Sequence, residues 1–234
     1  MKNQEMITSE TLVNKEFITQ GVMNWNSYRT DADSMKTIFK LGGKFSFQIS
    51  NEMKEGSSHI HAYACVSADK GSFYFILVPS KEDSPSNYHN LPATSANYIY
   101  AEVGAGTLPD HISGLISRNT AVDRTKRWSK LTDREDWIDA NTTNAGNTGI
   151  TEKGVFQAFV IPVSDLSVDI EHNCFLALKE DQSELTGTYA ADLIIDNAQG
   201  GLHCYDMVCS IPPFGQHAYT VEHKFGILHA IGIN

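Results

Sequence analysis

The pair His59-x-His61 is the only His-x-His in the chain, and its residue types and spacing suit metal chemistry. On an extended strand both imidazoles lie on one face, with their Cβ atoms roughly 7 Å apart. Two imidazoles so placed can bind one divalent ion such as zinc, which needs a third protein ligand and, for catalysis, an open position. The pair also fits a polar, solvated strand face on which both rings bond to water or to neighbours.

Several residues could complete such a metal site, and the sequence does not choose among them. In a metal-dependent enzyme, hydrolase-like or lyase-like, the ion would lower the pKa of a bound water and a carboxylate such as Asp192 would accept the proton. Asp192 and Asp196 would share one face of a helix or a strand. They equally fit a strand end, where they would cap a turn at Asn197. The candidate third ligands are His89, His111, His203, His217, His223 and His229.

A group of basic residues lies between positions 118 and 134, and it holds six of the 18 cations of the chain. Arg124, Arg127 and Lys130 could bind a phosphate, a carboxylate or a nucleotide, with the Trp128 indole as a stacking surface. The acidic surface of a protein partner fits the same charges. A solvated helix face is the third interpretation, because acidic neighbours balance the group. These neighbours are Asp123, Asp133, Glu135 and Asp136.

A second cluster of possible metal ligands contains His203, Cys204, Cys209 and His217. Cys204 and Cys209 would point to opposite faces of a strand, so a shared metal or a disulfide would require a bulge. The pattern favours buried cysteines that act as small apolar residues.

The chain lacks the motifs that mark the commonest enzyme classes. It contains no glycine-rich phosphate loop of the Walker or Rossmann type, no G-x-S-x-G and no H-E-x-x-H. Sites built from scattered residues remain possible. We therefore expect a protein that binds a small anionic ligand or a protein partner without covalent catalysis, and the metal-dependent enzyme is the alternative.

The composition is that of a soluble globular protein. The chain has 234 residues, which is enough for one large domain or two small ones. Of these residues, 41% are apolar and 20% are charged, as is ordinary for a globular protein. The formal net charge of -10 disfavours general nucleic-acid binding. The N-terminal residues lack the apolar run of a signal peptide, and no stretch is long enough to cross a bilayer. We therefore expect a cytoplasmic protein with four reduced cysteines.

A β-hairpin over residues 59–80 must position the histidine pair. Side chains alternate over residues 59–67, with His61 and Tyr63 on one face and Ile60 and Ala62 on an apolar face. The turn that follows contains Gly71, which is free to take a positive φ. The apolar run over residues 73–78 fits a central strand that ends at a proline.

Further elements precede and follow this hairpin. Residues 9–25 predict an amphipathic helix capped by Ser9, residues 33–41 fit either a helix or a strand, and residues 44–50 alternate as a half-buried strand. That strand and the hairpin are expected to form an antiparallel meander. A strand over residues 97–103, a helix after Pro109 and a helix from Thr132 come next.

The second half is expected to be almost entirely strand, over residues 155–163, 168–178, 189–196, 203–211 and 218–233. Residues 141–149 form a loop-like run and a possible sub-boundary within a single domain over residues 1–234. The predicted class is α+β: a mostly antiparallel, meander-like or sandwich-like sheet with helices at the N-terminus and mid-chain.

Overall fold

The computed structural model describes residues 13–91, 98–108, 116–143, 154–180, 189–197, 209–211 and 225–233. It is an α+β fold, as predicted. The strands are β1 (Lys44–Gln48), β2 (His59–Val66), β3 (Phe73–Pro79), β4 (Ile99–Glu102), β5 (Ala158–Pro162), β6 (Glu171–Glu180), β7 (Tyr189–Asn197) and β8 (Cys209–Ile211). They form an antiparallel three-stranded sheet, β1-β6-β7, and an antiparallel five-stranded sheet, β4-β3-β2-β5-β8.

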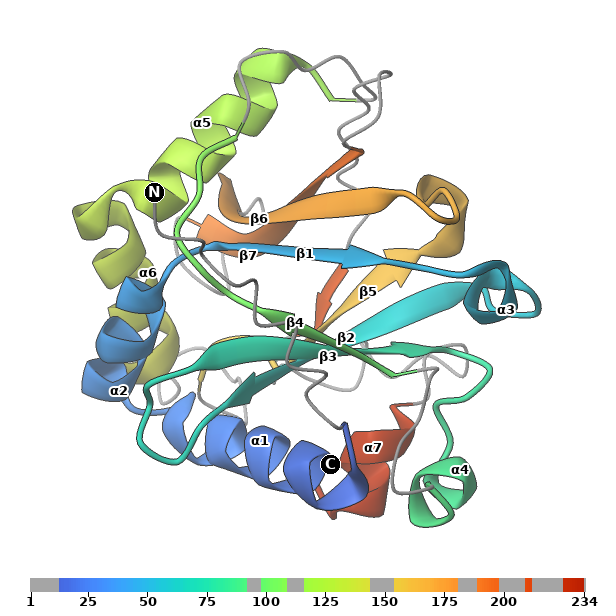
Figure 1. Ribbon diagram of the computed structural model, residues 1–234. Coiled ribbons are helices and arrows are strands. Elements are labelled where there is room, and N and C mark those ends of the chain that lie inside the picture. The colour runs from blue at the N-terminus through green and yellow to red at the C-terminus, as the bar shows by residue number, and fades with distance from the viewer. Residues whose placement is uncertain are drawn as a thin grey trace, which may run out of the picture.

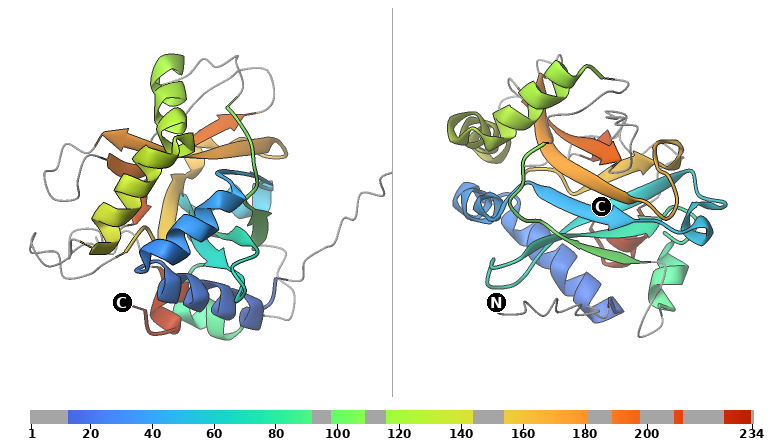
Figure 2. Two further views of the ribbon diagram at one scale, coloured as in Figure 1. Left: turned by 90° about the vertical axis from the view of Figure 1, so that its left-hand side faces the viewer. Right: turned by 45° about the horizontal axis from the view of Figure 1, so that its top comes forward.

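Helices lie around the two sheets, on their outer sides and at their ends (Figures 1 and 2). They are α1 (Lys15–Tyr28), α2 (Ala32–Ile38), α3 (Asn51–Lys54), α4 (Pro85–His89), α5 (Arg118–Ser129), α6 (Leu131–Thr143) and α7 (Gly226–Ala230), with 3-10 turns at Phe39–Leu41 and Val163–Asp165. In Figure 1 the layers run from α5 through the three-stranded sheet and the five-stranded sheet to α1 and α7. None of the helices in the described part of the chain has the length and apolarity to cross a bilayer.

The main core lies between the sheets and is rich in aromatic rings. Phe45 of β1 meets Phe75 of β3 with ring centroids 4.5 Å apart, and Phe75 also contacts Phe159 of β5. The predicted apolar face of the hairpin, from Ile60 to Val66, lies in this core. Its alternation is confirmed because a strand with one face in a core must place every second side chain there.

The hairpin also departs from prediction in two ways. Its turn takes its positive φ at Lys70 (60°) and not at Gly71, whose N–H donates to Asp69 Oδ1 at 3.0 Å. Its other face is not solvated, because α1 covers Tyr63 and Cys65 in a second core. The polar residue types on this strand face therefore did not predict whether the face is exposed to solvent.

The predicted meander of β1 with the hairpin is wrong. β1 pairs with β6, with Phe45 opposite Cys174. Between β1 and β2 the chain passes through α3 and Gly56, whose φ is +74°. This turn carries the chain from one sheet to the other. The phenylalanines of β1 therefore face those of β3 across the core instead of lying beside them.

A close backbone approach joins the beginning of β1 to the end of β4. The N–H groups of Gly43 and Lys44 both donate to Gly104 O, at 3.1 and 3.0 Å, and Gly104 N–H donates to Lys44 O at 2.7 Å. Gly42 has a φ of +147°, and a Cβ there would lie 2.0 Å from that carbonyl oxygen. Only glycine fits this position.

Several boundaries differ from the sequence prediction. Helix α1 begins at Lys15 behind the cap Asn14, whose Oδ1 accepts the Phe17 N–H at 2.8 Å, while Ser9 lies outside the described residues. The ambiguous segment 33–41 is helical. Helix α7 occupies part of the segment predicted as strand 218–233. The N–H of Ile227 in this helix is bound by the distant Asp83, a contact that no local pattern could show.

The loop predicted over residues 141–149 begins inside a helix. Helix α6 extends to Thr143, and Asn141 and Thr142 are buried. Residues 144–153 lie outside the described residues, as do the helix predicted after Pro109 and the predicted strand residues 203–208. The single domain and its sub-boundary remain predictions.

Candidate functional site

A cavity of about 670 Å³ lies beside α5, between this helix, the residues before β1 and the residues after β4. This volume is in the range of small-molecule sites. The described part of its wall comes from α5, from the approach to β1, from residues 105–108 and from Phe175 and Leu176 of β6. These segments are far apart in sequence, so the fold alone brings them together.

Helix α5 gives the cavity one continuous stripe of side chains. Ser117 caps the helix, and its Oγ accepts the Thr120 N–H at 3.1 Å. Ala121 of this helix is buried against the sheet. The side chains toward the cavity recur at the three- and four-residue spacings that share one helix face. They are Arg118, Val122, Thr125, Lys126 and Ser129.

A wall of small residues stands on the other side, formed by Gly42, Gly43, Ala105 and Gly106. A Cβ at Gly43 would lie 2.6 Å from Nε1 of Trp128. The missing side chain therefore leaves room for the indole. The Lys44 side chain lies in the same way against Gly106, so the small residues of this wall make room for large neighbours.

Trp128 is the central aromatic residue of the cavity. Its ring lies edge-on to Phe39, with centroids 4.8 Å apart, and both residues are buried. Its Nε1–H is buried and has no hydrogen-bond partner among the described residues. A buried donor without a partner costs about 1–3 kcal/mol, so such groups are rare. This exception lies in the wall of the cavity.

The charged residues of the described wall are all cations. Lys40, Arg118 and Lys126 are exposed, Arg134 is half-buried, and no carboxylate is among the described lining residues. Arg134 donates to the Trp128 carbonyl at 3.2 Å, and it forms no ion pair with a carboxylate in the described part of the chain. Burial lowers the pKa of Arg134. In a chain with a net charge of -10, the described part of this wall is therefore a local concentration of basic residues.

Of the four residues predicted to bind the ligand, only Trp128 lines the cavity. Arg124 Nη1 lies 2.8 Å from Asp192 Oδ2, Arg127 Nη2 lies 2.8 Å from Glu180 Oε1, and Lys130 Nζ lies 2.6 Å from Asp133 Oδ1. The cavity instead receives Arg118, Lys126 and Arg134 of the same basic group, together with Lys40. The helical spacing of Arg118, Val122 and Lys126 was a usable signal, but nothing in the sequence indicated Lys40.

Asp192 and Asp196 share the α5 side of β7, and both are buried. Asp192 lies between Arg124 and Lys179, whose Nζ is 3.7 Å from Oδ1. Burial raises the pKa of Asp192, and these two cations oppose the rise. Asp196 lies inside the strand and does not cap its end, and its Oδ1 has no hydrogen-bond partner in the described part of the chain. Asp192 therefore helps to hold α5 on the sheet.

Replacing Asp196 with asparagine is expected to raise the free energy of unfolding at pH 7 by about 1 kcal/mol, because a buried charge disappears that Lys44 and His172 compensate only in part. Burial raises the pKa of Asp196 in the folded protein. The folded state therefore holds the proton more tightly, and stability falls as pH rises through that pKa. Urea unfolding should show a smaller gain at pH 4 than at pH 7.

Asp133→Asn is the matched control, because the contribution of Asp133 to stability is expected to depend on pH in the opposite direction. Its contact with Lys130 lowers the pKa of Asp133, so its stabilising contribution is present at pH 7 and is lost as pH falls. A gain for Asp196→Asn that is equal at both pH values would contradict the assignment.

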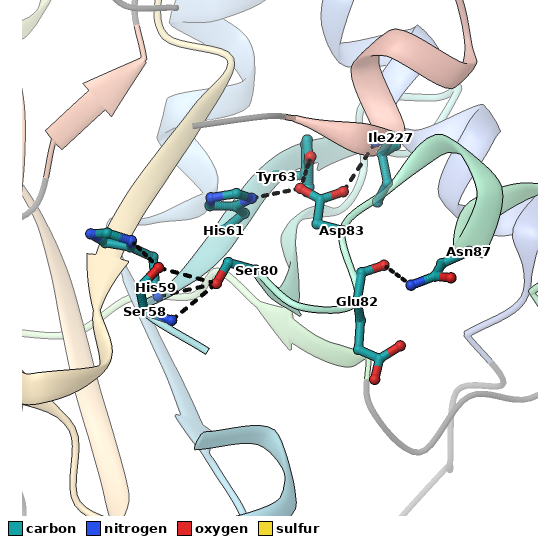
Figure 3. Close-up of polar contacts among 9 residues, drawn as sticks. All are labelled: Ser58, His59, His61, Tyr63, Ser80, Glu82, Asp83, Asn87 and Ile227. Atoms are coloured by element: carbon teal, nitrogen blue, oxygen red, sulfur yellow. Dashed lines mark hydrogen bonds and ion pairs between the residues drawn. The ribbon is translucent and has the colours of Figure 1, made fainter. Parts of the chain in front are cut away.

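The predicted histidine pair lies on β2 of the five-stranded sheet, and its two rings have different partners (Figure 3). His61 is buried, and its Nδ1 lies 2.6 Å from Asp83 Oδ2. Tyr63 donates to the same oxygen at 2.5 Å, and the Ile227 N–H donates to Asp83 Oδ1 at 3.1 Å. Burial raises the pKa of Tyr63. His59 is half-exposed, and its Nδ1 lies 2.9 Å from Ser58 Oγ.

The described residues contain no group of three or more His, Cys, Asp or Glu side chains that could hold a metal ion. His89 and His229, which are described, do not complete such a group. The other four candidate ligands, His111, His203, His217 and His223, lie outside the described residues. Asp192 lies under α5 while His61 lies under Phe225, so the structure does not bring the proposed proton acceptor to the histidine pair.

The cysteines are placed only in part. Cys65 and Cys174 are buried free thiols, and burial raises the pKa of both. The backbone of Cys209 belongs to β8. Cys204 and the side chain of Cys209 lie outside the described structure, so the cluster of His203, Cys204, Cys209 and His217 remains a prediction.

No protein-family model, curated protein or solved structure matched this chain.

Proposed function

We propose that this protein binds a small anionic ligand in the cavity beside α5 and does so without covalent catalysis. One observation carries the proposal: the described wall of a cavity of about 670 Å³ contains four cations and no carboxylate. The chain has 28 acidic and 18 basic residues, so the charge of this described wall is opposite in sign to the net charge of the chain.

The cations differ in what they would contribute. Exposed Lys40 and Lys126 would attract an anion from solution through a potential that salt screens. Arg134 is half-buried, where a charge–charge contact is stronger than in water. Its guanidinium still has donors left after the single bond to the Trp128 carbonyl. A bound anion would supply the counter-charge.

The concave site favours a small molecule over the acidic surface of a protein partner, because small ligands bind in clefts that enclose most of their surface. The free thiols of Cys65 and Cys174 are compatible with the cytoplasmic location expected from the sequence.

Removing two cavity charges is expected to weaken anion binding at least tenfold, since a single charge-assisted hydrogen bond contributes about 1.5–3 kcal/mol and about 1.4 kcal/mol corresponds to a factor of ten. The variant is Lys126→Gln with Arg134→Gln. Isothermal titration calorimetry with phosphate, citrate and benzoate, at 20 and 200 mM salt, would measure the affinities of the parent protein and of the variant. Affinity should also fall as salt rises.

Lys130→Gln with Arg127→Gln is the matched control. It removes the same number and types of charge from the same region, but from residues paired with Asp133 and Glu180 outside the described wall. It should change affinity less than twofold. Equal losses in both double variants, or no binding by any anion of the panel, would refute the proposal.

A further inference from the structure

We infer that the ligand of this cavity is an oligoanion, with at least three negative charges spread over more than one acidic group, and not an ion with one or two charges. This inference rests on the proposed function and specifies its ligand class. It comes from the division of the cations around α5 into those that carboxylates of the chain neutralise and those that they do not.

The basic residues at α5 that do not line the described wall each have a carboxylate partner. The three ion pairs have N–O distances of 2.8, 2.8 and 2.6 Å, so their charges are already compensated within the protein. A bound anion would gain little from such cations. The pairs are Arg124 with Asp192, Arg127 with Glu180 and Lys130 with Asp133.

The cations of the described wall differ in this respect. Lys40 and Lys126 are exposed, and neither forms an ion pair with a carboxylate among the residues that the structure describes. Half-buried Arg134 donates to the Trp128 carbonyl, which carries no full charge. Three positive charges therefore meet at the cavity without a counter-charge from the described chain. A ligand with one or two charges would leave part of this charge uncompensated.

These charges are also distributed over several elements. Lys40 precedes β1, Lys126 belongs to α5 and Arg134 belongs to α6. Arg118, which also lines the cavity, lies eight residues before Lys126, a separation of about 12 Å along the helix axis. A ligand with linked acidic groups can contact several of these cations at once, because after the first contact the others form within one complex.

Inorganic phosphate, pyrophosphate and tripolyphosphate test the inference on the full chain, since they share one chemistry and differ in charge. Isothermal titration calorimetry at constant ionic strength, without divalent cations, should give tripolyphosphate an affinity at least tenfold above that of phosphate, with pyrophosphate between them. Lys40→Gln with Lys126→Gln should weaken tripolyphosphate binding about fivefold, the scale of two exposed ion pairs. The same variant should leave phosphate within twofold, because Arg134 remains to hold a single acidic group.

Lys36→Gln with Lys130→Gln is the matched control. It also removes two lysine charges, but from residues paired with Asp139 and Asp133 outside the described wall. It should change every affinity less than twofold. Equal losses of tripolyphosphate affinity in the two double-lysine variants would show attraction by net charge alone and would overturn the inference.

Citrate separates two chemistries that can carry three charges. An affinity for citrate equal to that for tripolyphosphate would support selection by charge number, and an affinity as weak as that for phosphate would support a phosphate chain. Equal affinities for the three phosphate probes, each weakened by Lys126→Gln with Arg134→Gln, would overturn the ligand class and leave the anion site standing. Absence of binding by every probe, or binding insensitive to that double variant, would overturn both.

Discussion

Replacement of Asp83 with alanine is expected to lower the free energy of unfolding by about 4 kcal/mol, because three buried donors lose their acceptor at once and each costs about 1–3 kcal/mol. These donors belong to His61, Tyr63 and the backbone of Ile227 (Figure 3). The carboxylate of Asp83 is completely buried, so water does not replace it in the folded protein.

Equilibrium unfolding in guanidinium chloride would measure the loss. Glu82→Ala is the matched control, since it removes the neighbouring carboxylate, which points away from the cluster in Figure 3. That variant should stay within about 0.5 kcal/mol of the parent protein. If Asp83→Ala were equally mild, Asp83 would not hold the three donors together.

The second large effect is expected from Arg124→Ala, which should lower the free energy of unfolding by about 2 kcal/mol because it leaves a buried carboxylate with weaker compensation. Asp192 is fully buried, and its close contact is Arg124 Nη1 at 2.8 Å. The loss should fall short of that for an isolated buried charge because Lys179 remains 3.7 Å from the carboxylate.

Arg127→Ala is the control for the loss of an arginine from the same helix. Its partner Glu180 is 73% exposed, so the expected loss is below about 1 kcal/mol. Combining Arg124→Ala with Asp192→Asn should restore part of the stability in urea unfolding, because the uncompensated charge is gone. Strictly additive losses would show that the pair is not coupled.

The sequence predicted those parts of the fold that depend on local patterns. The alternation from Ile60 to Val66 and the continuous apolar run in β3 predicted the two strands of the hairpin. Strand geometry alone decides which side chains of such a segment face a core. The strand β1 and helix α6, with Trp137 and Ile138 on its buried side, followed from similar local signals. The α+β class followed from the sum of these elements.

The candidate site was predicted less well, because it depends on which side chains meet across the fold. The basic group around Trp128 was recognisable as a concentration of charge. The sequence indicated Asp133 as a balancing neighbour of Lys130, but it did not show that Arg124 and Arg127 would pair with Asp192 and Glu180. Those two partners lie on β7 and on β6, and their distance from α5 depends on the sheet and on the packing of the helix.

The sequence by itself determined the class of fold, the faces of the hairpin and the presence of a cationic region in an acidic chain, because residue type and spacing suffice for each. The tertiary structure decided that β1 pairs with β6, that His61 is buried against Asp83, and that Lys40 joins Arg118, Lys126 and Arg134 around one cavity. The physical reason is common to these three: each is a contact between segments distant in sequence, set by the packing of two sheets and their covering helices.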